Sequence, residues 1–231
     1  MIIEYPAIKY RHELKHKIHA GEAIVLSSRL KTFMRLDPNA NEKGNYFIHS
    51  LYFDTPDDKA LKEKLNGNLQ REKFRIRYYN DNLEFIRLEK KIKHNGLCAK
   101  RSTRLTKEET QAIIDGKIDF LLTSKDPLKI EFYSKLKGEL LRPSVIVSYE
   151  RKAFIYDVSN VRVTIDQNLY TYKNMKEFLK LSHQRIKVDQ QWVLEVKYNE
   201  FLPDIVKKTL QGIARQTGTY SKFAKSRLMD W

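Results

Sequence analysis

Phe74-Arg75-Ile76-Arg77-Tyr78-Tyr79 is the stretch that decides the fold, because apolar and cationic side chains alternate along it. Side chains of a β-strand point alternately to the two faces of a sheet. Arg75 and Arg77 therefore share one face, and the apolar side chains share the other. Lys73 has the same parity as the two arginines and is expected near the strand start. The stretch predicts a strand with one face for packing and one cationic face.

The same alternation recurs in four further predicted strands. The residues that share a polar face there are Arg87, Glu89, Lys91 and Lys93, then Tyr149 and Arg151, then Arg162 and Thr164, then Glu195 and Lys197. On one strand, such a pattern usually marks a solvent-exposed face. Five strands together favour a shared cavity lined by cations. Parity places Lys91 on the cavity face and Lys90 on the opposite one.

The remaining pattern predicts an α+β fold: an antiparallel β-barrel that forms a polar, basic tunnel, with helices packed around it. Strands are expected at 8–17, 46–53, 74–79, 83–93, 98–105, 144–155, 161–167 and 192–198. Helices are expected at 21–35, from Pro56 to the residue before Gly67, from Thr106 to Gly116, at 128–141 and at 203–213, with a short basic segment at the end. We find no repeat or linker, which predicts a single domain over 1–231.

The charge of the chain limits the chemical classes of partner that it is expected to bind. The 231 residues include 44 Lys and Arg against 29 Asp and Glu, a net charge of +15. Residues 71–104 and 205–229 supply +7 and +6 of this excess. Such segregation indicates an anionic partner: nucleic acid, polyphosphate, a nucleotide or an anionic membrane surface. Two basic solvent faces remain the alternative.

The cysteine count and the hydropathy pattern exclude several further classes of protein and site. The single cysteine, Cys98, excludes an internal disulfide and a cysteine-based zinc site, and it makes the reducing cytosol the expected compartment. No apolar run approaches the ~20 residues of a membrane span. We recognise no helix-turn-helix, zinc knuckle or RNP-type motif, so nucleic acid is not the expected partner.

Nine short motifs follow one another along the chain. They are Arg11-His12-Glu13-Leu14-Lys15, Ser50-Leu51-Tyr52-Phe53-Asp54-Thr55, Phe74–Tyr79, Leu88-Glu89-Lys90-Lys91, Ala99-Lys100-Arg101, Tyr149–Phe154, Arg162–Asp166, Val193–Lys197 and Ser221–Lys225. This series resembles the VTC (vacuolar transporter chaperone) domain, a polyphosphate polymerase of the triphosphate tunnel metalloenzyme superfamily. The resemblance covers nearly the whole chain. It implies a bare catalytic domain without the SPX module or membrane helices of some relatives.

The resemblance implies roles for individual residues. The catalytic cations would be Lys15, Arg75, Arg77, Lys91, Arg151 and Arg162. The substrate-binding residues would be Lys100, Tyr149, Ser221, Lys222 and Lys225. Glu195 would bind Mn²⁺ or Mg²⁺, with Glu13 as a second candidate for metal binding or water activation. Parity alone also places Glu89 in the tunnel, where its hard oxygens suit the same metals. Tyr149 either stacks on a nucleotide base or packs and hydrogen-bonds.

The function that the resemblance implies is synthesis of polyphosphate from the terminal phosphate of ATP or another nucleoside triphosphate. Hydrolysis of triphosphate or polyphosphate, and binding of either without turnover, stay open as alternatives. Export of the product would require a membrane channel, which this sequence does not show. A separate membrane protein partner is therefore conceivable, with the domain in the cytoplasm or held at the membrane surface through that partner.

Overall fold

The computed structural model describes residues 7–180, 185–213 and 218–229. Its centre is a ten-stranded sheet in which every pairing is antiparallel. The main order is β1 (His12–Ile18), β10 (Trp192–Tyr198), β8 (Val161–Tyr172), β7 (Arg142–Tyr156), β3 (Asn45–Asp54), β4 (Gln70–Tyr79), β5 (Asn82–His94) and β6 (Leu97–Leu105). Two short strands complete it: β2 (Arg35–Leu36) pairs with β7, and β9 (Ile186–Asp189) pairs with β8. The predicted α+β class is confirmed.

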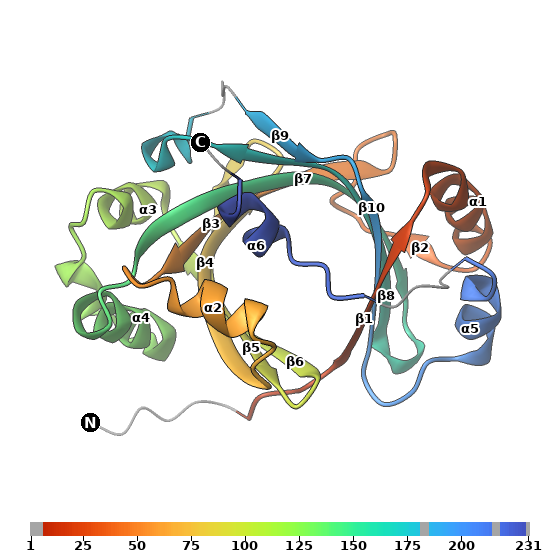
Figure 1. The fold of residues 1–231 in the computed structure, drawn as a ribbon, viewed down its shortest axis with the longest axis horizontal. Helices are drawn as coiled ribbons and strands as arrows, with labels where there is room; N and C mark the ends of the chain where they lie inside the picture. Colours follow the sequence, from red (N-terminus) through yellow and green to blue (C-terminus); the bar gives the residue numbers. More distant parts are fainter. Residues whose placement is uncertain (1–6, 181–184, 214–217, 230–231) are drawn as a thin grey trace.

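The sheet curls until its two edges approach each other (Figure 1). They meet at one bridge, where Arg11 and Cys98 exchange two backbone hydrogen bonds of 2.9 Å. The sheet is therefore a curled tunnel wall and not a barrel closed along its length. The first strand was predicted from Ile8, but regular pairing begins only at His12.

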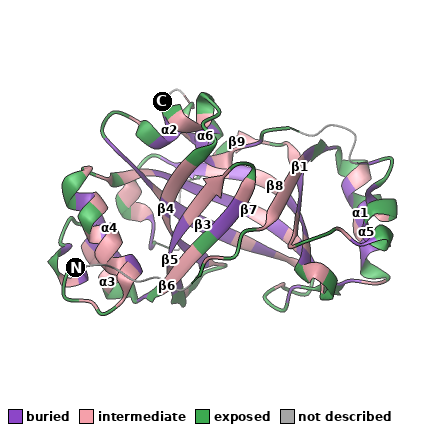
Figure 2. Cartoon of the chain, turned by 90° about the horizontal axis from the view of Figure 1, so that it is seen from below, coloured by how far each residue is buried: buried purple, intermediate pink, exposed green. Residues whose placement is uncertain are grey.

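Helices cover the outer, apolar face of the sheet at two sides (Figure 1). On one side lie α1 (Ala20–Lys31) and α5 (Asp204–Leu210), and on the other lie α3 (Lys107–Ile114) and α4 (Pro127–Gly138). Leu26 of α1 packs in one core cluster with Val163 and Leu194, while Phe132 of α4 packs with Phe74 and Ile76. Figure 2 shows the strands mostly buried or half-buried and the outer sides of α1 and α5 exposed. With its outer face covered, the sheet keeps its polar face for the interior of the curl.

Two short helices lie beside the opening of the curl. They are α2 (Lys59–Leu65) and α6 (Lys222–Arg227). In Figure 1, α6 and residues 218–221 before it cross the inside of the curled sheet. Phe223 and Ala224 of α6 pack in a core cluster with Leu61 of α2 and Val147 of β7. Helix α6 therefore belongs to the tunnel region.

Several predicted boundaries were wrong for local reasons. The helix expected from Pro56 begins at Lys59, because Asp58 adopts a left-handed φ of 59°. The strand expected to end at Gln167 continues to Tyr172, past Asn168, whose φ is 52°. Neither β2 nor β9 was predicted, since both are very short. The capping box at Thr106 was correct.

No helix in the described ranges has the length and apolar character needed to cross a membrane.

Candidate functional site

The concave face of the curled sheet encloses a cavity of about 530 Å³. Fifteen Lys and Arg side chains and two carboxylates line it. The cations are Lys9, Arg11, Lys15, Lys64, Arg71, Lys73, Arg75, Arg77, Lys91, Lys93, Lys100, Arg151, Arg162, Lys197 and Lys222, and the carboxylates are Glu13 and Glu195. The structure therefore brings the polar faces of the alternating strands to one cavity. Such a concentration of one charge in a concave wall focuses positive potential on an anion.

The two lining carboxylates lie on the adjacent strands β1 and β10. Glu13 is opposite Lys197, and Lys15 is opposite Glu195, so the four charges alternate on one face. Lys15 Nζ lies 3.2 Å from Glu13 and 3.5 Å from Glu195. Burial opposes ionisation of Glu195, but the charges of Lys197, Lys15 and Arg151 outweigh it and hold its pKa well below its usual range. Both carboxylates are therefore anionic at any physiological pH.

These carboxylates fit a divalent metal only in part. In the described part of the chain, no group of three or more His, Cys, Asp or Glu could hold an ion. Mg²⁺, however, is commonly bound through one or two carboxylates together with substrate phosphates and water. Glu13 and Glu195 are diagonal neighbours across β1 and β10, both buried and ionised. They suit a metal that arrives with a phosphate substrate.

A second cluster lies on β4 and β5 around Glu89, whose side chain is 0% exposed. Arg75 binds it as a fork, with Nε and a terminal nitrogen 2.8 and 2.6 Å from Oε2. Lys100 donates to its other oxygen at 2.7 Å. Burial opposes ionisation, but Arg75, Arg77 and Lys100 lower the pKa of Glu89 far below its usual range. Glu89 thus holds Arg75 and Lys100 in place behind the cavity lining.

Arg77 has neutral hydrogen-bond partners, whereas Arg75 is paired with a carboxylate. Its Nε donates to the Ser50 hydroxyl at 3.0 Å, and a terminal nitrogen donates to the Tyr149 hydroxyl at 3.4 Å. Its distance to Glu89 is 3.9 Å. Neutral partners orient this guanidinium without cancelling its charge, so much of that charge remains for an anion in the cavity.

A third cluster joins β7, β8 and α6. Arg151 forms a two-point ion pair with Asp166, at 2.6 and 2.8 Å. Lys222 reaches the same carboxylate at 2.6 Å and lies 4.5 Å from the centre of the Tyr149 ring. Tyr149 is therefore packed beneath Lys222 and hydrogen-bonded to Arg77. Ser221 caps α6 by accepting a hydrogen bond from the Ala224 amide at 3.2 Å.

The remaining predicted residues divide between the cavity and its outside. Lys91 lines the cavity and contacts Glu13 at 2.8 Å, whereas Lys90 turns to the opposite face and pairs with Glu72 at 2.6 Å. Arg162 donates to the Tyr46 hydroxyl at 2.8 Å and pairs with Asp37. Lys225 does not line the cavity. It pairs with Asp189 of β9, a strand that the sequence pattern did not reveal.

The site residues predicted from the sequence did not include two acids, Asp166 and Asp37, or seven of the lining cations, which are Lys9, Arg11, Lys64, Arg71, Lys73, Lys93 and Lys197. Asp166 and Asp37 are buried and orient Arg151 and Arg162. The parity of Asp166 with Arg162 was a usable signal, but Asp37 lies in a loop and gave none. Lys73 lines the cavity beside Arg75, with Nζ 3.9 Å from the centre of the Phe223 ring. Burial, together with the charge of Arg71, lowers its pKa to about 7.

We expect binding of tripolyphosphate at about pH 8 to be accompanied by proton uptake. Above a pKa of about 7, Lys73 is mostly neutral, and a bound anion favours its charged form. The uptake should decline as the pH falls below this pKa, where Lys73 is already protonated. Titration calorimetry in buffers of different ionisation enthalpy measures the effect, and Lys73→Met should remove most of it. Tyr52 has a pKa lowered to about 8 by Arg75 and Arg77 against the effect of burial, so Tyr52→Phe is the matched variant. Uptake lost in Tyr52→Phe but kept in Lys73→Met would contradict the assignment.

The curled antiparallel sheet and its cationic interior define a triphosphate tunnel fold. Two solved structures are similar to it. A protein from Bacillus halodurans described as a putative adenylate cyclase has 15% identity and a TM-score of 0.55, covering 94% of this chain and 96% of its own. A Hippeastrum protein described as a putative adenylyl cyclase with dominant triphosphatase activity has 17% identity and a TM-score of 0.54, covering 94% and 95%. These likenesses concern the fold.

The chain belongs to the VTC domain family, because the model of that family matches residues 10–229. The resemblance inferred from the nine motifs is thereby confirmed. A search of curated proteins gave no match.

Proposed function

We propose that this VTC domain is a metal-dependent polyphosphate polymerase. It would transfer the terminal phosphate of ATP, or of another nucleoside triphosphate, to a growing polyphosphate chain. The observation that carries the proposal is the composition of the cavity, which fifteen Lys and Arg side chains line. Five acids oppose them: Glu13 and Glu195 in the lining, and the buried Glu89, Asp166 and Asp37 behind it, so a cationic excess remains. An anion with several adjacent charges is the ligand that balances such an excess.

The geometry supplies what phosphoryl transfer requires. The reaction needs alignment of the attacking and leaving oxygens and neutralisation of charge on the transferred group, with little covalent help. Arginine can fork onto two phosphate oxygens, whereas lysine acts as a point charge. Arg75, Arg151 and Arg162 are each oriented by a buried carboxylate, and Arg77 by two hydroxyl groups. Fixed guanidinium groups of this kind can hold a triphosphate without reorganising.

Glu195 and Glu13 would hold Mn²⁺ or Mg²⁺ together with phosphate oxygens. The metal would neutralise phosphate charge and help to align the reacting groups. Lys15 and Lys197, which contact both carboxylates, keep them ionised and ready to bind the cation.

Hydrolysis is the alternative reaction, in which water takes the place of the chain end. A general base works best with a pKa near the operating pH. Lys91, Lys15 and Lys197 hold the pKa of Glu13 far below that range despite its burial and the nearby Glu195 charge. Glu13 is therefore a weak base for activating water, which favours transfer to the already anionic end of a phosphate chain.

The products of one incubation test the proposal. Purified protein is mixed with ATP and Mn²⁺ or Mg²⁺, and the products are separated on a polyphosphate gel and assayed for free phosphate. Metal-dependent chains would support the polymerase. Free phosphate without chains would instead identify a hydrolase, and binding of polyphosphate with neither product would identify a binding module. The membrane partner and the cytoplasmic location stay predictions from the sequence.

A further inference from the structure

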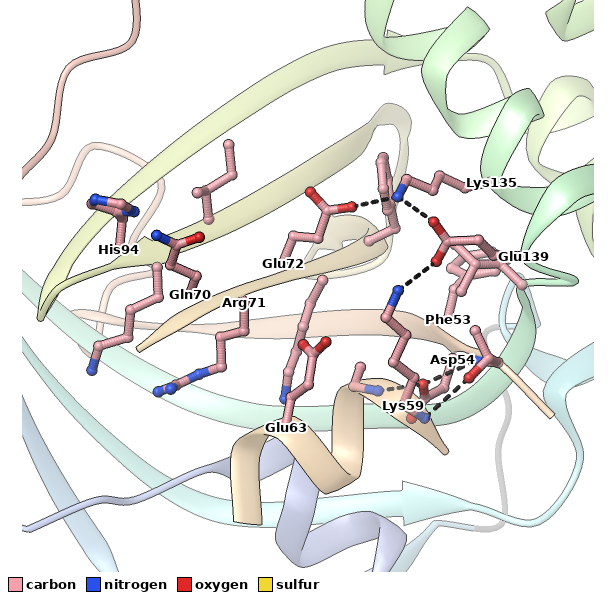
Figure 3. A pocket seen from close by; sticks show the side chains of 17 residues that line it. Phe53, Asp54, Lys59, Glu63, Gln70, Arg71, Glu72, His94, Lys135 and Glu139 are labelled. Carbon is pink, nitrogen blue, oxygen red and sulfur yellow. Dashed lines mark hydrogen bonds and ion pairs between the residues drawn. The ribbon is translucent and has the colours of Figure 1, made fainter. Parts of the chain in front are cut away.

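A second cavity of about 400 Å³ lies beside the main one, between α2, β4, β5 and α4 (Figure 3). At one end its charges are paired with each other. Lys59 lies 3.0 Å from Glu139, and Lys135 lies 3.0 Å from Glu72. Figure 3 shows these four side chains grouped together by their ion pairs. The charges at this end therefore balance, and they leave no excess positive charge for an anion to neutralise.

The other end of this cavity is cationic and continuous with the main cavity. Arg71, Lys73 and Lys93 line both cavities, and Lys64 of α2 lines the main one beside them. In Figure 3, Arg71 extends away from the ion-paired group. Within the ranges that the structure describes, none of these four cations forms an ion pair. The Arg71 guanidinium donates a hydrogen bond to the Asn68 carbonyl.

The four cations repel one another. The pKa of Lys64 is lowered by partial burial and then by the charges of Arg71, Lys15 and Lys93. Burial lowers the pKa of Lys73, and Arg71 and Lys64 lower it further. Like charges held together at a partly buried site are unfavourable until an anion neutralises them.

The nearby acids do not supply that neutralisation. Asp54 attracts the charge of Lys73, but its oxygens accept hydrogen bonds from the amides of Ala60 at 2.8 Å and Leu61 at 3.2 Å. Glu63 of α2 and His94 of β5 also line the second cavity, and neither forms an ion pair with the four cations. The junction between the two cavities, formed by Lys64, Arg71, Lys73 and Lys93, therefore lacks the negative charge that would balance its four cations.

We propose that Lys64, Arg71, Lys73 and Lys93 form an exit subsite, which holds phosphates of a polyphosphate chain that extends beyond the main cavity between α2 and the β4–β5 pair. The inference rests on the proposed function and adds the path by which the polyphosphate chain leaves the main cavity. A triphosphate held by the arginines of the main cavity would lie near Lys73, which lines the cavity beside Arg75, but would not need Lys64, Arg71 or Lys93. A longer chain would contact both groups of residues, so the subsite should make affinity depend on chain length.

The test compares two ligands on one double variant. Lys64→Ala/Arg71→Ala removes two junction charges, and Lys62→Ala/Lys107→Ala removes two exposed charges that line neither cavity. Binding of tripolyphosphate and of long-chain polyphosphate is measured by calorimetry at constant ionic strength. We expect the junction variant to bind the long chain at least ~10-fold more weakly, since each charge-assisted phosphate contact is strong. Its tripolyphosphate affinity should change less than ~3-fold, as expected for partly screened neighbours. The control pair should bind both ligands as the unmodified protein does.

Each other result has a definite meaning. Equal losses for both ligands would assign the junction to the triphosphate site, and unchanged long-chain binding would show that it holds no phosphate. Either result overturns the exit subsite. If the unmodified protein binds neither phosphate ligand, the proposed function itself fails. Should the double variant not fold, Lys64→Gln on the half-exposed side of α2 provides the same comparison.

Discussion

Replacing Glu195 with glutamine should lower metal-dependent turnover at least ~100-fold, because a bound metal supplies several kcal/mol of transition-state stabilisation. The amide keeps the shape of the side chain and loses the charge that holds the cation. The structure adds a second expectation. Glu195 offsets the charges of Lys15 and Lys197, so its neutralisation makes the cavity more positive. Tripolyphosphate binding without metal should therefore be kept or strengthened.

The opposite directions of these two effects make the prediction specific. Turnover is followed as phosphate released or polymerised at saturating metal, and binding is followed by calorimetry. Glu200→Gln is the matched control, since Glu200 is exposed and follows the same strand. Near-normal turnover in a folded Glu195→Gln protein would remove this carboxylate from the mechanism. Weaker binding without metal would show that Glu195 orders the lysines more than it opposes the substrate.

Replacing Arg75 with alanine should lower the free energy of unfolding by about 3 kcal/mol or more, as is usual when one partner of a buried ion pair is removed. Glu89 would remain fully buried, with Lys100 as its one close cation and Arg77 at 3.9 Å. Arg77→Ala should destabilise the fold less, because its closest partners are the neutral hydroxyls of Ser50 and Tyr149. Both variants should weaken tripolyphosphate binding, each losing a contact of roughly 1.5–3 kcal/mol.

Urea unfolding and phosphate titration of the same samples separate stability from binding. Removing both charges of the pair, in Arg75→Ala/Glu89→Ala, should recover part of the lost stability because no buried charge is left without its partner. Equal and small losses of stability for Arg75→Ala and Arg77→Ala would contradict the burial of this cluster. Retained affinity in both would mean that the phosphate does not contact this face of the sheet.

The sequence by itself determined which side chains of a strand share its polar face. Alternation along a strand is a local property with a period of two residues, so Arg75, Arg77, Lys91 and Arg151 could be assigned to one face without any knowledge of strand order. The same reasoning separated Lys91 from Lys90, which the structure places on opposite faces. The α+β class followed from the spacing of strands and helices.

Only the tertiary structure decided how those charges are balanced. Asp166 meets Lys222, 56 positions away along the chain, and Asp37 meets Arg162 across a loop. Lys225 turned outward to Asp189, although its spacing from Lys222 allowed a shared side. An ion pair depends on the register between strands and on where a helix docks, and the packing of the whole chain sets both. The net charge follows from the sequence alone. Which charges remain for a ligand depends on ion pairs between residues that are far apart along the chain.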